Sequence, residues 1–221
     1  MSERSKTYDN HNYKNFICLE SHTLVTHKLT LMRDKNTQPK EFRELLEEVT
    51  LLVSSEALRN LSFEDKIVET PIAKYKGIKI NTVTLIPVIR AGLSMMSPLQ
   101  KLLPDAKVGF MGVSRDHDTL AAKEYYVNIP NIADNETALI LDPMLATGNT
   151  LVHTLDYLKE KNVKNIIIIS IVATPKALEN IFAHHPDCLI YSAGFDTELN
   201  EMGYIVPGLG DAGDRIFNTF E

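Results

Sequence analysis

Apolar runs of strand length alternate with helical patterns along this chain, and that alternation constrains the fold more than any other feature. Ile166 to Val172 is continuous and largely β-branched, as expected of a parallel strand covered on both faces. Pro39 to Asn60 carries apolar residues at helical spacing, which predicts an amphipathic helix. This alternation favours an α/β fold with a parallel sheet and helices on both faces. Further strands are expected at 81–89, 107–113, 137–141 and 188–192.

Composition limits the kinds of partner that the chain can have. The 221 residues are 44% hydrophobic and 24% charged, which fits a single domain over residues 1–221 with a polar N-terminal arm at 1–16. The net charge of −6 gives no general attraction to nucleic acid or to a membrane. Cys18 and Cys188 lack metal-ligand spacing and fit a reduced, cytoplasmic setting, and the polar N-terminus is not expected to be a signal peptide.

The stretch from Asp142 to Thr150 follows one strand pattern and precedes a helical one. That order predicts a turn that presents backbone N–H groups at a helix N-terminus, where a phosphate is favoured. Thr147 and Thr150 add hydroxyl groups, and Gly148 lets the backbone approach a ligand closely. Asp142 ends the strand, where its carboxylate can meet a sugar hydroxyl or a metal-bound water.

Two arginines follow other predicted strands. Arg90 lies in the segment 87–92, which is either an ordinary strand-to-helix turn or a diphosphate cradle with a charged clamp. Arg115 lies in the polar stretch 114–123, which is either a solvated loop or a lid over a substrate. The carboxyl ends of parallel strands meet at one edge of a sheet, so both arginines are expected near Asp142.

The C-terminal tail contains the pattern G-x-G-x-x-G at Gly208, Gly210 and Gly213. A dinucleotide site would also need a preceding strand, a following helix and an acid about 20 residues further on, and the chain ends before such an acid could occur. A glycine-rich turn is one alternative. The other is a loop whose exposed backbone recognises a small planar ligand.

Taken together, these segments resemble the phosphoribosyltransferases over about residues 20–221. Asp142-Pro143-Met144-Leu145-Ala146-Thr147-Gly148 is similar to the ribose-phosphate motif of the uracil branch, and the segment 87–92 to its diphosphate-binding segment. Residues 115–119 resemble its lid, and residues 204–214 its uracil-binding segment. The chain departs from the family pattern at three places. Asn149 and Ser94 stand where glycines are usual, and residues 97–98 stand where Asp-Gly is usual. Asn tolerates left-handed geometry, so the turn at Asn149 is expected to persist.

The resemblance implies transfer of a 5-phosphoribosyl group from 5-phosphoribosyl 1-diphosphate (the sugar diphosphate) to uracil, giving UMP and diphosphate. It also implies Mg²⁺ carried on the diphosphate rather than bound by protein side chains. Arg115 and Asp211 would be catalytic. The implied sugar-diphosphate site is Arg90, Arg115, Asp142, Pro143, Met144, Leu145, Ala146, Thr147, Gly148, Asn149, Thr150 and Asp211. The implied uracil site is Tyr204, Ile205, Gly210, Asp211 and Ala212, within a base-binding hood at about 193–221.

The implied partners are the two substrates, a second copy of the chain in a homodimer or homotetramer, and a GTP-type nucleotide as a candidate activator. Two other functions stay open: a regulator or binding module that senses the sugar diphosphate, and a transferase for another base. The intact tail argues against another base, and the lack of an added nucleic-acid-binding segment argues against a regulator.

Overall fold

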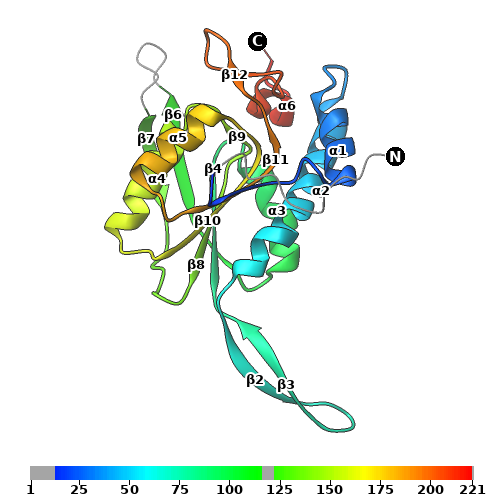
Figure 1. Ribbon diagram of the computed structural model, residues 1–221, viewed down its shortest axis with the longest axis vertical. Helices are drawn as coiled ribbons and strands as arrows, with labels where there is room; N and C mark the ends of the chain where they lie inside the picture. The colour runs from blue at the N-terminus through cyan, green and yellow to red at the C-terminus, as the bar shows by residue number, and fades with distance from the viewer. Residues whose placement is uncertain (1–12, 116–121, 221) are drawn as a thin grey trace.

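The computed structural model describes residues 13–115 and 122–220, with no side chains described at 114, 115, 122 and 123. A mostly parallel sheet lies at its centre, in the order β1-β11-β10-β8-β4-β6-β7, and β7 is antiparallel to β6 (Figure 1). β5 pairs with β4, and β9 pairs with β10. The strands are β1 Phe16–Cys18, β4 Val83–Ile89, β5 Lys107–Val108, β6 Phe110–Arg115, β7 Ala122–Asn128, β8 Thr137–Leu141, β9 Met144–Leu145, β10 Asn165–Ala173 and β11 Leu189–Phe195.

Helices cover both faces of this sheet, as the sequence predicts. In β8, Leu139 and Leu141 face one apolar layer, while Ala138 and Ile140 face the other, because successive strand residues point to opposite faces. The helices α1, α2, α3 and α6 pack on the first layer, and α4 and α5 pack on the second (Figure 1). The helices are α1 Thr23–Arg33, α2 Pro39–Ala57, η1 Leu58–Asn60, α3 Leu93–Leu102, α4 Asn149–Glu160, α5 Pro175–His184 and α6 Ala212–Phe217.

Several predicted elements need correction at their ends. The strand expected at 107–113 is divided at Gly109 into β5 and β6, although the N–H of Gly109 still donates to the carbonyl of Leu85 in β4. The polar stretch 114–123 is not wholly a loop, since β6 continues to Arg115 and β7 begins at Ala122. The proposed lid tip, 116–121, lies outside the described residues, as do residues 1–12 of the proposed N-terminal arm.

A hairpin extends away from the body of the molecule (Figure 1). Its antiparallel strands are β2 Phe63–Glu69 and β3 Lys74–Ile80, and both are almost entirely exposed. Apolar side chains on the hairpin are therefore open to solvent in the single chain: Phe63, Ile67, Val68, Ile72, Tyr75, Ile78 and Ile80. At the opposite end lies a second hairpin, β12 Glu198–Leu199 and β13 Ile205–Val206, beside α6. Among the described residues, no helix is both long enough and apolar enough to cross a bilayer.

Candidate active site

The segment 142–150, named here the phosphate loop, forms the predicted strand end, turn and helix start. The N–H of Asp142 donates to the carbonyl of Ile169, which ties the start of the loop to β10. Gly148 has a φ of 80° and is the N-cap of α4, which begins at Asn149. A helix leaves the N–H groups of its first turn without intrahelical partners, and its N-terminus carries partial positive charge. This geometry suits a phosphate group, and phosphate binding at the phosphate loop stays a prediction.

Helix α5 supports the phosphate loop from the side away from the cavity. The hydroxyl of Thr174 donates to the carbonyl of Ala146 at 2.6 Å. The side-chain amide of Asn180 donates to the carbonyl of Thr147 at 3.0 Å and to Oδ1 of Asn149 at 2.9 Å. Sequence analysis missed Asn180 because its contacts join residues more than thirty positions apart. Asn149 thus makes a contact with α5, and the left-handed residue of the turn is Gly148 rather than Asn149.

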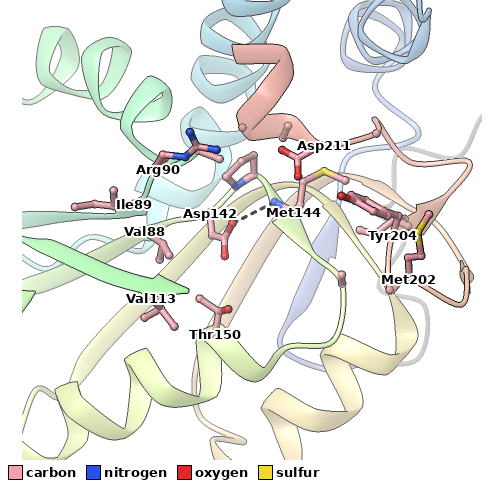
Figure 2. A pocket seen from close by; sticks show the side chains of 18 of the residues that line it. Val88, Ile89, Arg90, Val113, Asp142, Met144, Thr150, Met202, Tyr204 and Asp211 are labelled. Carbon is pink, nitrogen blue, oxygen red and sulfur yellow. Dashed lines mark hydrogen bonds between the residues drawn. The ribbon is translucent and has the colours of Figure 1, made fainter. Parts of the chain in front are cut away.

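A cavity of about 800 Å³ opens at the carboxyl ends of β4, β6 and β8, above the phosphate loop (Figure 2). The carboxylate of Asp142 faces this cavity, and its Oδ1 accepts a hydrogen bond from the N–H of Met144 at 3.3 Å. Most of the predicted site residues line the cavity: Arg90, Asp142, Pro143, Met144, Ala146, Thr150, Tyr204, Ile205, Gly210, Asp211 and Ala212. Among the predicted residues whose side chains the structure describes, four do not line it: Leu145, Thr147, Gly148 and Asn149.

The turn after β4 brings Arg90 to the cavity beside the C-terminal helix. Gly92 allows this turn, because a Cβ atom there would lie 2.2 Å from the carbonyl oxygen of Leu141. Nη2 of Arg90 lies 3.6 Å from Oδ1 of Asp214, and its guanidinium is 5.8 Å from the ring centre of Phe217. The Arg90 side chain is 56% exposed, so this ion pair contributes little stability. Its charge is therefore available at the edge of the cavity.

The other predicted arginine, Arg115, is described only by its backbone at the end of β6. That strand end lies at the same edge of the sheet as the cavity, and Val113, two residues earlier, lines it. The role of the Arg115 side chain stays a prediction.

The segment 204–213, named here the base loop, closes the other side of the cavity. Asn200 shapes its start, since Oδ1 of Asn200 accepts from the N–H groups of Met202 and Tyr204. The Asp211 side chain caps α6 by accepting from the N–H of Asp214 at 2.9 Å. The cavity is also lined by Glu201, Met202 and Gly203, which lie within the predicted base-binding hood but were not among the predicted site residues.

The glycine pattern of the tail now has a structural explanation. Gly208 and Gly210 have φ values of 56° and 71°, which favour glycine. A Cβ atom on Gly208 would lie 2.1 Å from the carbonyl oxygen of Ile205, so the loop folds tightly on itself there. The pattern lies in a turn between the two-residue strand β13 and the short helix α6. That setting differs from the longer strand–helix unit of a dinucleotide site.

The central sheet, the phosphate loop at its carboxyl edge and the base loop above it define the class of type I phosphoribosyltransferases. Adenine phosphoribosyltransferase from Leishmania donovani has the same fold, with a TM-score of 0.58 at 17% identity over 89% of this chain and 90% of that chain.

A sequence model described as "Uracil phosphoribosyltransferase" matches residues 19–219, and the chain belongs to that family. It is 50% identical over 200 residues to uracil phosphoribosyltransferase from Thermosipho melanesiensis, covering 90% of this chain and 96% of that protein. It is 48% identical to uracil phosphoribosyltransferase from Campylobacter fetus, covering 92% and 98%. The AQ2163 protein from Aquifex aeolicus is similar in structure, with a TM-score of 0.86 at 34% identity over 92% and 99%.

Proposed function

We propose that the protein transfers the 5-phosphoribosyl group from the sugar diphosphate to uracil, giving UMP and diphosphate. The observation that carries this proposal is that the phosphate loop and the base loop line one cavity. Membership of the uracil phosphoribosyltransferase family supports the same pair of substrates. In the reaction, the bond from uracil N1 to the anomeric carbon forms while the bond from that carbon to diphosphate breaks, and the N1 proton is released to solvent.

The cavity residues supply mainly positioning and charge stabilisation. The first turn of α4, with the phosphate loop, would bind the 5-phosphate. The carboxylate of Asp142 would bind ribose hydroxyls, directly or through water. Arg90 and Arg115 would stabilise the negative charge that develops on the leaving diphosphate. Asp211 lines the cavity, and it would lie between the base and the sugar and orient the substrates. We assign no dedicated general base.

Uracil recognition would rest on the backbone of the base loop. Uracil presents two carbonyl acceptors with an N–H donor between them, and N–H and C=O groups of Ile205, Gly210 and Ala212 would match this pattern. The ring of Tyr204 would form part of the wall around the base. Cytosine carries an amine in place of one carbonyl, which would leave a buried polar group unpaired. Sites of this kind can discriminate by roughly four orders of magnitude.

The carboxylates of the cavity fit Mg²⁺ that arrives with the diphosphate. In the described part of the chain, no three His, Cys, Asp or Glu side chains come together in a way that could hold a metal ion. Asp142 and Asp211 both line the cavity, and carboxylates suit Mg²⁺ that keeps several waters and substrate oxygens as ligands. When bound, Mg²⁺ would neutralise charge on the leaving diphosphate.

We also propose that the protein forms a homodimer or homotetramer. The support is the β2–β3 hairpin, because a two-stranded hairpin is at best marginally stable alone in water and this one exposes apolar side chains such as Ile67 and Ile78. Sedimentation of the full chain would measure its oligomeric state.

A GTP-type nucleotide stays a candidate activator. The buried thiols of Cys18 and Cys188 support a reducing, cytoplasmic setting.

A diphosphate-release assay with Mg²⁺ and the sugar diphosphate tests the proposed reaction. Release with uracil, but not with cytosine, adenine or hypoxanthine, is expected. Release with a different base would identify a transferase for that base. Binding of the sugar diphosphate without release in the presence of any base would identify a binding module and refute the enzyme proposal. Adding GTP to the same assay tests activation.

A further inference from the structure

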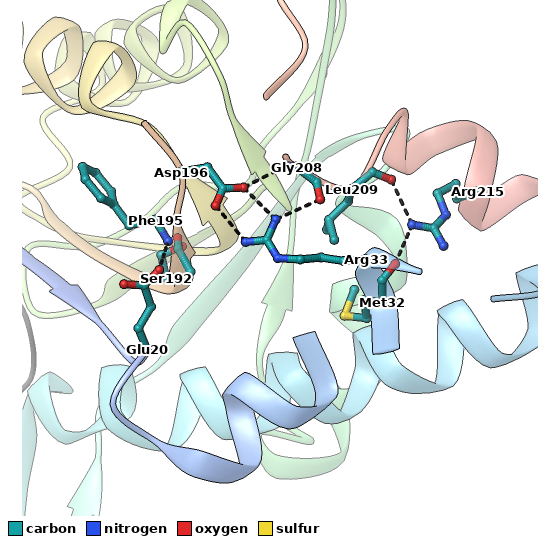
Figure 3. A network of polar contacts seen from close by, with 10 residues as sticks. Glu20, Met32, Arg33, Ser192, Phe195, Asp196, Gly208, Leu209 and Arg215 are labelled. Carbon is teal, nitrogen blue, oxygen red and sulfur yellow. Dashed lines mark hydrogen bonds and ion pairs between the residues drawn. The ribbon is translucent and has the colours of Figure 1, made fainter. Parts of the chain in front are cut away.

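Two arginines that are distant in sequence hold the middle of the base loop against helix α1 (Figure 3). Gly208 and Leu209 lie between Ile205 and Gly210, which line the cavity. Neither Gly208 nor Leu209 lines the cavity itself. The groups that hold these two residues therefore act on the loop from outside the substrate site.

The first contact is an ion pair that engages both backbone polar groups of Gly208. The guanidinium of Arg33 and the carboxylate of Asp196 form two hydrogen bonds, at 2.7 and 2.8 Å. Nη1 of Arg33 also donates to the carbonyl of Gly208 at 2.9 Å, and the N–H of Gly208 donates to Oδ2 of Asp196 at 2.9 Å. Asp196 is 7% exposed, so its carboxylate is well shielded from water, while the Arg33 side chain is 24% exposed. Bidentate pairs of this kind fix geometry as well as adding energy.

The second contact joins the neighbouring residue to the end of α1. Arg215, which is 8% exposed, donates to the carbonyl oxygens of Leu209, Met32 and Asp34. Its guanidinium lies 4.2 Å from the ring centre of Phe42. Burial lowers the pKa of Arg215, while the carbonyl groups at the C-terminal end of α1 favour a cation there. Arg215 therefore anchors the base loop to the helical layer.

A close backbone contact links the position of Gly208 to that of Ile205, which lines the cavity. Gly208 folds against the carbonyl of Ile205, as described above, so the two residues cannot shift independently. Gly194 leaves the space that this arrangement needs, because a Cβ atom there would lie 2.6 Å from the side chain of Leu29 and 3.4 Å from Nη2 of Arg33. The ion pair between Arg33 and Asp196 thus fixes the position of the backbone groups that would contact the base.

We propose that Arg33 and Asp196 are a positioning pair that sets the base selectivity of the active site. The inference rests on the proposed uracil transfer. A loop that recognises a base through its backbone has no side chain that adjusts to a misplaced ligand, so its selectivity depends on where its N–H and C=O groups are held. Loss of the pair should weaken use of uracil, and discrimination against cytosine, more than use of the sugar diphosphate.

The test is steady-state kinetics of Arg33→Ala and Asp196→Asn, singly and combined, beside wild type and Lys28→Ala. Lys28 is the matched control, because it lies on α1 and pairs with Glu48 at 2.6 Å, away from the base loop. For each single variant we expect the KM for uracil to rise on the order of 10-fold to 100-fold, since misplacement of about 1 Å can cost that much. The KM for the sugar diphosphate should rise much less, because Asp211 is the one residue of its predicted site that lies in the base loop.

Further outcomes separate a positioning role from a merely structural one. The ratio of kcat/KM for uracil to that for cytosine should fall in both single variants, and the combined variant should lose little more than either single variant. Arg33→Lys keeps the positive charge but lacks the planar guanidinium that forms two hydrogen bonds with Asp196. Its KM for uracil should therefore lie between those of wild type and Arg33→Ala. If Arg33→Ala does not fold, Asp196→Asn, which keeps the side-chain volume, carries the same expectation.

The proposal is wrong if folded variants keep the wild-type KM for uracil and the wild-type base ratio, or if kcat alone falls in proportion to the unfolded fraction. Failure of the proposed function has a different signature, because wild type itself would then release no diphosphate with uracil.

Discussion

Replacing Gly92 by alanine should damage both the stability of the protein and its use of the sugar diphosphate. A Cβ atom at this position would lie 2.2 Å from Leu141 O, 2.7 Å from Val88 O and 2.8 Å from Val88 N. All three neighbours are backbone atoms of β4 and β8, so no side chain can rotate away. Because contacts under 3.0 Å essentially do not occur, the two strand ends would have to separate by about 0.8 Å, the difference between 3.0 and 2.2 Å.

The magnitude follows from this forced separation. Overpacking costs about 1–3 kcal/mol, and three rigid contacts place Gly92→Ala near the upper value. A chain of this length loses about 2–4 °C of Tm per kcal/mol, so we expect Tm to fall by roughly 6–12 °C. The displaced strand ends carry Arg90 and Asp142, and a shift of about 1 Å at such groups can lower kcat/KM on the order of 100-fold.

Thermal unfolding and the diphosphate-release assay measure the two effects. Lys40→Ala is the control, because the Lys40 side chain is 83% exposed on α2 and its ion pair with Glu44 contributes little stability. That variant should unfold within about 2 °C of wild type, in keeping with a surface change of about 0.5 kcal/mol or less. The reasoning is refuted if Gly92→Ala also unfolds within that interval and keeps wild-type kinetics.

Three other perturbations test separate parts of the structure. Asn180→Ala removes two hydrogen bonds to the phosphate loop and should cost about 1–3 kcal/mol in urea unfolding while raising the KM for the sugar diphosphate; unchanged values would contradict its supporting role. Burial alone would raise the pKa of Glu136, but hydrogen bonds from Lys107 and a backbone N–H lower it overall. The ionised Glu136 side chain therefore stabilises the folded protein at neutral pH, and this stabilisation is lost as pH falls through the lowered pKa. Glu136→Gln should therefore lose less stability than wild type between about pH 5 and about pH 3. Equal losses in the two proteins would show that folding does not lower the pKa of Glu136. Cys18 is buried, and burial raises the pKa of Cys188 to about 12, so neither thiol should react with a thiol reagent at about pH 8 until the protein unfolds.

Local pattern was enough to predict strands β4, β8, β10 and β11 and the turn between β8 and α4. The apolar run 137–141 coincides with β8, and the periodic segment from Pro39 to Asn60 coincides with α2 and η1. Periodicity and capping are properties of adjacent residues, so a sequence displays them directly. The meeting of Arg90 and Asp142 at one sheet edge also follows from parallel topology.

Contacts between distant segments could not be predicted in the same way. Arg33 and Asp196 are 163 positions apart, and Arg215 reaches a carbonyl 183 positions away. A lone arginine after a helix pattern gives no sign of its partner. The contact of Asn149 with Asn180 could not be predicted for the same reason, because it depends on how α5 packs beside the phosphate loop. Tertiary packing decides such cases, and single-sequence periodicity does not contain it.

The position of UMP bound to the full chain tests the central claim most directly, because UMP carries a phosphate, a ribose and a base in one molecule. A crystal structure of the complex should place the phosphate at residues 146–150, the ribose hydroxyls near Asp142 and the uracil edge against the backbone of Ile205 and residues 210–212. The account of one cavity with two substrate halves is contradicted if the UMP phosphate lies at Arg90, or if the base lies outside the base loop.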